Sequence, residues 1–143
     1  MLKTTLLNAG GGLPSEIVGV ASSGDYLITK QPRAHYLKDY QKDREEAVKR
    51  FYGITPIGGG LRRPVMVSHI LGIPWIICDL HNRNIMRDRD GHAVIIDALI
   101  GEVNDYDRAR IPWLEAAAKD AKHFRETGEI PRDTFGDVDD DEL

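Results

Sequence analysis

The sequence predicts an α+β domain, on three observations. Short β-branched runs occur in pairs, turn residues lie between them, and one longer segment shows helical spacing of apolar residues. The chain has 143 residues, of which 41% are hydrophobic and 29% charged. A chain of this length can bury a core without disulfides, and no internal repeat divides it. We therefore expect one domain over residues 1–132.

The first elements predicted are a glycine loop and a β-hairpin. Gly10–Gly12 reads as a loop, and it lacks the G-x-G-x-x-G spacing of a phosphate-binding turn. Residues 17–20 and 26–30 are β-prone and surround the turn-forming stretch 22–25. Gln31-Pro32 then ends the second strand, because proline cannot donate to a strand ladder.

The next segment predicts a helix over residues 35–52. Its apolar residues recur along one face, with His35 at the start and Gly53 as the expected C-cap; they are Tyr36, Leu37, Tyr40, Ala47, Val48 and Phe51. A second helix is predicted from Pro112, a favoured first residue, to Thr127, with Gly128 beyond it.

Four short strands are predicted between these helices. Residues 65–70 and 74–78 form one apolar pair, and residues 85–86 and 93–96 form another. The second pair is joined by a turn ending in Asp90-Gly91, and Asp-Gly is a strong hairpin signal because glycine accepts a positive φ.

The composition of the chain indicates its cellular location and excludes some kinds of binding partner. The only cysteine, Cys78, excludes an internal disulfide, and no apolar run approaches the roughly 20 residues of a membrane span, so we expect a cytoplasmic protein. Residues 133–143 carry six acidic and no basic side chains and predict a disordered tail. The basic residues between 30 and 63 alternate with acids at helical spacing, which argues against a nucleic-acid partner.

One block carries a chemical pattern. It runs Ile-Ile-Cys-Asp-Leu-His-Asn-Arg-Asn-Ile-Met over residues 76–86 and ends, after the glycine turn, in Ile-Ile-Asp at 95–97. Asn84 opens the predicted hairpin and Asp97 closes it, so the two should lie side by side, with Asp79 on the entering loop. Three oxygen-bearing side chains at the open end of this hairpin would suit Mg²⁺.

This block resembles the catalytic loop and metal-binding Asp of the protein-kinase-like superfamily. It is closer to the aminoglycoside-phosphotransferase-like members, and closest to the polyvalent protein kinase group of bacteria and phages. Asp-Leu-His-x-Arg-Asn is typical of that group, as is Gln-Pro after a strand, which matches Tyr26–Pro32. The resemblance covers residues 17–103 and implies a reduced kinase-like fold: a hairpin and hinge followed by a small C-lobe.

The resemblance also implies roles for individual residues. Asp79 would be the catalytic base, with His81 or Arg83 as the cation of the loop. Asn84 and Asp97 would hold Mg²⁺ on the phosphates of ATP. Lys30 and Gln31 would lie at the hinge, against the nucleotide.

The departures from the family pattern leave the activity open. Ile77 stands where protein kinases have histidine, and Asp97 is followed by Ala-Leu rather than Phe-Gly. About 30 residues precede the hinge, too few for a full N-lobe, and neither Lys3 nor Lys30 is selected as the missing phosphate-binding lysine. Three hypotheses therefore remain: a phosphotransferase-related protein that binds ATP and Mg²⁺, a non-catalytic pseudokinase-like module for a protein partner, and a half-enzyme that needs a second chain. An exposed apolar patch would favour dimerisation.

Overall fold

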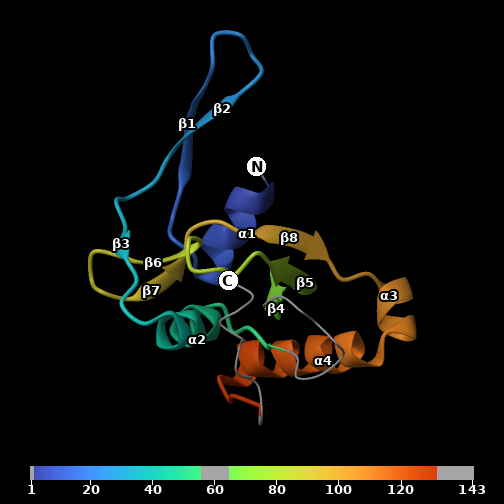
Figure 1. Cartoon of the computed structure of the whole chain (residues 1–143). Coiled ribbons are helices and arrows are strands. Elements are labelled where there is room, and N and C mark those ends of the chain that lie inside the picture. Colours follow the sequence, from blue (N-terminus) through green and yellow to red (C-terminus); the bar gives the residue numbers. More distant parts are fainter. Residues whose placement is uncertain (1, 56–64, 132–143) are drawn as a thin grey trace.

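A computed structural model describes residues 2–55 and 65–131 of the chain. In this part the α+β prediction is confirmed, since helices and small antiparallel sheets alternate along the sequence (Figure 1). The predicted acidic tail at 133–143 and the glycines at 58–60 lie outside the described residues.

Three antiparallel sheets are present in the described ranges. Residues far apart in sequence meet in two of them, because residues 35–36 pair with 86–87 and residues 75–78 pair with 99–102. The sheets are β1-β2 (Glu16–Val20, Leu27–Lys30), β3-β6-β7 (His35–Tyr36, Ile85–Arg87, Ala93–Ile95) and β4-β5-β8 (Met66–Ile70, Ile73–Cys78, Leu99–Glu102). All four predicted strands of the middle region are therefore confirmed, with the register Met66–Ile77 and Ile85–Ile95 among their pairs.

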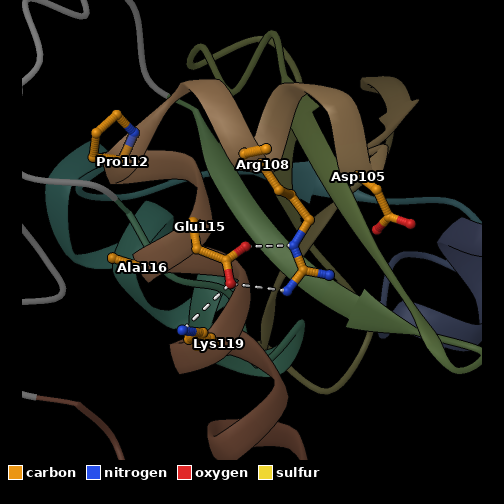
Figure 2. Close-up of a pocket in the computed structure, with 7 residues that line it drawn as sticks. Asp105, Arg108, Pro112, Glu115, Ala116 and Lys119 are labelled. Atoms are coloured by element: carbon orange, nitrogen blue, oxygen red, sulfur yellow. Dashed lines mark hydrogen bonds and ion pairs between the residues drawn. The ribbon is translucent and has the colours of Figure 1, made fainter.

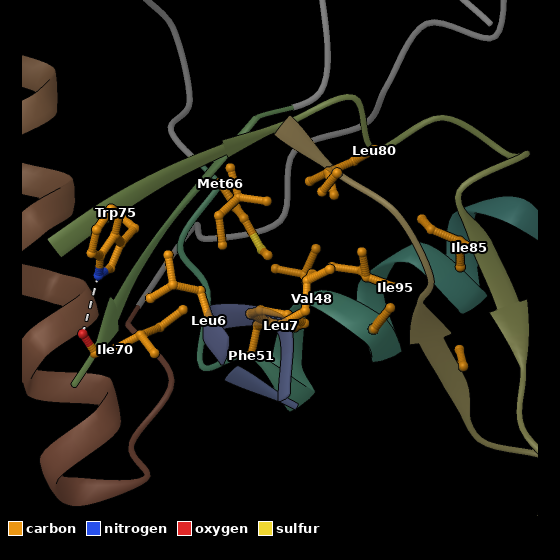
Figure 3. Close-up of a cluster of buried hydrophobic side chains, with 14 residues drawn as sticks. Leu6, Leu7, Val48, Phe51, Met66, Ile70, Trp75, Leu80, Ile85 and Ile95 are labelled. Carbon is orange, nitrogen blue, oxygen red and sulfur yellow. Dashed lines mark hydrogen bonds between the residues drawn. The ribbon is translucent and has the colours of Figure 1, made fainter. Parts of the chain in front are cut away.

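Strands β4 and β5 are largely buried on both faces, which explains their almost continuous apolar sequence, whereas β8 lies at the exposed edge. Met66 and Ile77 point into one hydrophobic cluster, which Figure 3 shows filled by side chains from helices and strands. Val67 and Ile76 point into a second cluster on the opposite face. Helix α4 (Pro112–Thr127) covers that second face, and its bounds are those predicted from Pro112 and Gly128.

Helix α2 (Tyr40–Arg50) covers the sheet that carries the β6-β7 hairpin. Asp39 caps it by accepting a hydrogen bond from the backbone N–H of Lys42. The prediction that the helix begins at His35 was wrong, because His35 and Tyr36 pair with β6 instead. Tyr36, expected on the buried helix face, is 90% exposed.

The end of α2 also differs from the prediction. Phe51 is the C-cap, and Tyr52, not Gly53, takes the left-handed conformation, with φ of 51°. Gly53 is required for a different reason, because a Cβ there would lie 2.6 Å from Sδ of Met66. The glycine thus permits close packing between the helix end and β4.

Two helices were not predicted: α1 (Leu2–Gly10) and α3 (Asp105–Arg110). Leu6 and Leu7 of α1 are buried in the first cluster (Figure 3). The glycines that follow allow the helix end to fit against the body, since a Cβ on Gly10 would lie 2.2 Å from Cε1 of Phe51 and one on Gly12 would lie 2.9 Å from the carbonyl oxygen of Ile95. These glycines serve packing.

Candidate active site

Strand register places the three predicted site residues at one corner of the fold. Asp79 directly follows the last pair of β5 and β8, which joins Cys78 to Leu99. The carbonyl oxygen of Asn84 accepts a hydrogen bond from the N–H of Ile96, 2.9 Å away. Asp97 therefore lies between Ile96, which is opposite Asn84, and the start of β8, which pairs with β5.

The structure brings the side chains of Asp79 and Asn84 into direct contact. The amide nitrogen Nδ2 of Asn84 donates to the carboxylate Oδ2 of Asp79 at 3.1 Å and to its backbone carbonyl at 2.9 Å. The amide oxygen of Asn84 takes part in neither bond. Asn84 is 9% exposed, whereas the Asp79 side chain is 41% exposed, so a buried amide holds a carboxylate that solvent can still reach.

His81 lies against the same two residues, and its contacts fix its tautomer. The backbone N–H of Arg83 donates to Nδ1 at 3.1 Å, so in the neutral ring the proton sits on Nε2. Nε2 lies 3.1 Å from Oδ1 of Asp79 and can donate to it. Both hydrogens of the Asn84 amide are already directed at Asp79, so its 3.1 Å approach to Nε2 is a contact between two donors.

The loop that carries these residues is anchored in the core. Leu80 is fully buried, and its carbonyl oxygen accepts a 2.6 Å hydrogen bond from the hydroxyl of Tyr40 on α2. Asp79 has φ of 66°, in the left-handed region that aspartate tolerates better than most side chains do. Backbone strain of this kind gathers at functional sites, where the surrounding packing maintains it.

Asp97 does not join the contacts of Asp79 and Asn84. Its Oδ1 accepts the N–H of Ala98 at 2.9 Å and forms an ion pair with Nζ of Lys3 on α1. In the described ranges, the one group of three acidic or histidine side chains with ligand atoms within 4.8 Å of one another is Asp88, Asp90 and His92. Asp79, His81 and Asp97 are therefore more widely spread than a preformed cage.

The other predicted residues lie around this corner at different distances from it. The side chain of Gln31 donates to the carbonyl oxygen of Leu13 at 3.3 Å. The N–H of Leu13 in turn donates to the carbonyl oxygen of Ile95. Leu13 therefore links the Gln-Pro segment to the strand that leads to Asp97. Lys30 ends β2 in register with Glu16. The contacts within the described chain join neither Lys30 nor Gln31 to Asp79. Arg83 is exposed, which leaves its guanidinium outside the Asp79 contacts.

Two contacts at this corner, Lys3 with Asp97 and Tyr40 with Leu80, were not predicted from sequence. Lys3 lies 94 residues from Asp97, and nothing local marks their pairing. Tyr40 was interpreted only as part of an apolar helix face. Tyr40 is the first residue of α2, directly after the N-cap Asp39. Its hydrogen bond to the carbonyl oxygen of Leu80 depends on tertiary packing, so no local signal in the sequence predicts it.

Two other features lie apart from this corner. Asp88 accepts the N–H groups of Asp90 and His92, each at 2.9 Å, as a turn within the β6-β7 hairpin. A hollow with a volume of about 820 Å³ lies between α3 and α4, and Figure 2 shows residues that line it. Its charged residues pair with one another, as Arg108 bonds to Glu115 at 2.6 Å and Lys119 approaches it at 3.4 Å. Neither feature includes a residue of the predicted site.

Comparisons with protein-family models, with curated proteins and with solved structures found no match to this chain. Among the described residues, no helix combines the length and apolar character needed to cross a membrane.

Proposed function

We propose that this chain is a kinase-like, phosphotransferase-related protein that binds ATP with Mg²⁺ at the corner formed by Asp79, Asn84 and Asp97. The observation that carries the proposal is the hydrogen-bonded pair of Asp79 and Asn84 on an anchored loop, beside the strand end that presents Asp97. The acceptor substrate is not specified by these residues.

The donor set at this corner fits a hard divalent cation. Asn84 has an amide oxygen that is not used toward Asp79, and both contacts of Asp97 use Oδ1, which leaves Oδ2 as its second oxygen. The Asp97 side chain is 59% exposed, so an ion that keeps several waters can reach it. A cationic group, the ammonium of Lys3, already lies on this carboxylate. When bound, Mg²⁺ would neutralise charge on the transferred phosphoryl group.

Asp79 fits the role of a base that orients an acceptor hydroxyl. His81 and Asn84 each donate to one of its carboxylate oxygens, so the group is fixed in direction while it remains partly exposed to solvent. The exposed Arg83, rather than His81, is then the loop cation able to approach a phosphoryl group. His81 instead orients Asp79.

Calorimetric titration of the full chain with ATP and Mg²⁺ tests the proposal. We expect saturable binding that needs the ion and is lost in Asp97→Ala. Asp120→Ala, an exposed carboxylate on α4, is the matched control and should bind as the wild type does. Absence of binding at millimolar ATP with Mg²⁺, including at high protein concentration, would contradict the proposal.

A second candidate, a module that binds a protein partner, is favoured by the β1-β2 ribbon. The ribbon extends away from the body in Figure 1, and its large apolar side chains are exposed: Ile17, Val18, Val20, Tyr26, Leu27 and Ile28. A two-stranded ribbon alone is only marginally stable in water. Sedimentation of the wild type against Val20→Lys/Leu27→Lys would test it. Concentration-dependent association that the double variant loses would identify a second copy of this chain as the partner, whereas identical monomers would exclude that partner.

A further inference from the structure

The inference concerns Lys3 and rests on the proposed function, which it deepens. Helix α1 is fixed to the body by Leu6 and Leu7, which are 1% and 5% exposed. Lys3 precedes them by three and four positions, so all three share one face of the helix. The helix thus directs the Lys3 side chain toward the corner that contains Asp97.

The ion pair formed there contributes little to holding the fold together. The Lys3 and Asp97 side chains are 48% and 59% exposed, and solvent screens ion pairs as exposed as this one. The free energy needed to separate Lys3 from Asp97 is correspondingly small. Both groups can therefore take other partners without unfolding the helix.

Occupation of Asp97 by a divalent ion would force such a change. The ammonium of Lys3 lies on the carboxylate that the proposed function assigns to Mg²⁺. Two cations on one carboxylate repel each other, whereas the phosphates that arrive with the ion carry several negative charges close by. An ammonium has three donors on a flexible stem and binds phosphate well as a point charge.

We propose that Lys3 is the phosphate-binding lysine of this site and exchanges partners on loading. It neutralises Asp97 in the empty site and binds the polyphosphate in the loaded one. Among the residues that the structure describes, Lys3 is the lysine in contact with a predicted metal ligand, whereas Lys30 lies on β2 opposite Glu16.

This exchange predicts effects of opposite sign in one variant. Lys3→Met removes the positive charge that opposes a bare divalent ion, so Mn²⁺ alone should bind as tightly as in the wild type or more tightly. The same variant loses a charge-assisted bond to phosphate, so ATP with Mg²⁺ should bind about tenfold more weakly. Lys3→Arg keeps the charge and should remain close to the wild type for both ligands.

The measurements are free Mn²⁺ by electron paramagnetic resonance and ATP with Mg²⁺ by calorimetry, on the full chain. Lys122→Met removes a comparable exposed pair with Glu126 on α4 and serves as the control. A circular-dichroism melt confirms that each variant is folded. Opposite shifts in Lys3→Met support the inference.

Three results would overturn it. Unchanged ATP binding in Lys3→Met would exclude Lys3 as a phosphate ligand while leaving the proposed function intact. Loss of both ligands in Lys3→Met and Lys3→Arg would show that Lys3 only supports the site. Failure of the wild type to bind either ligand would refute the proposed function together with this inference.

Discussion

Asn84 donates a 3.1 Å hydrogen bond from Nδ2 to Oδ2 of Asp79, five residues earlier in the chain. The same nitrogen also bonds the Asp79 carbonyl, so one buried amide fixes both the backbone and the side chain of an aspartate with positive φ. The loop conformation therefore depends on a donor at position 84.

Replacing this donor should destabilise the loop. Asn84→Asp keeps the shape but removes both N–H donations and puts a second carboxylate against Asp79. We expect the free energy of unfolding to fall by about 1–3 kcal/mol, measured by urea denaturation. Asn82→Asp adds the same charge at an exposed position of the loop and is the control. Equal stability of the two variants would contradict the hydrogen-bonded loop described here.

The ion pair between Asp43 and Arg87 predicts how the stability of the fold depends on pH. Burial alone would raise the pKa of Asp43, but hydrogen bonds from Arg87 and from the backbone N–H of Lys38, with the charge of Arg87, outweigh it and hold that pKa below its ordinary value. Because the folded-state pKa is the lower one, Asp43 stabilises the fold above about pH 4, the pKa of an unperturbed Asp. That stabilisation should disappear as the pH falls further, and Asp43→Asn should flatten this part of the stability profile.

Removing the partner of Asp43 has a larger expected effect. Arg87→Met leaves a fully buried carboxylate without its cation and should cost about 3–5 kcal/mol of stability. Adding Asp43→Asn to that variant should restore part of the loss. Lys49→Met, which removes the exposed pair with Glu45, is the control and should cost about 1 kcal/mol or less. An equal loss in Arg87→Met and Lys49→Met would show that the buried pair is not as described.

The glycines after α1 give a prediction that separates packing from ligand binding. Gly10→Ala places a methyl group against the buried ring of Phe51 and should destabilise the fold by about 1–3 kcal/mol, measured by thermal and urea unfolding. Gly19→Ala, whose Cβ would meet only Cδ1 of Ile28 at 3.9 Å, should change stability little. A stable Gly10→Ala that binds ATP poorly would instead favour a phosphate-binding role for this segment.

Local signals predicted much of the fold. The Asp-Gly turn identified the β6-β7 hairpin, and Pro112 with Gly128 identified the bounds of α4. The sequence did not reveal α1, because a nine-residue helix is marginal in isolation and depends on burying Leu6 and Leu7. Nor did helical spacing distinguish His35–Tyr36 from the true start of α2, since their pairing with β6 is nonlocal.

In the candidate site, as in the fold, local pairing could be predicted from the sequence and nonlocal contacts could not. Hairpin closure was expected to bring Asn84 beside Asp97, and the structure places Asn84 opposite Ile96, the residue before Asp97, because pairing within a hairpin is local. The direction of the Asp97 carboxylate depended on Lys3, at the far end of the sequence, and so could not be inferred. The sequence left His81 and Arg83 open as the loop cation, because the hydrogen bond from the backbone N–H of Arg83 to Nδ1 of His81 needs the folded turn.

The thiol of Cys78 reports on the charge of Asp79 without any ligand. Burial, together with the negative charge of Asp79, raises the pKa of Cys78, so we expect alkylation by iodoacetamide near pH 8 to be slower in the folded chain than in urea. Asp79→Asn removes the charge and leaves the burial, so it should speed alkylation of the folded chain by roughly twofold to fivefold. Asp120→Asn should leave the rate unchanged. Equal rates in the wild type and Asp79→Asn would mean that burial alone governs the thiol, and that the Asp79 carboxylate is directed further from Cys78 than the structure places it.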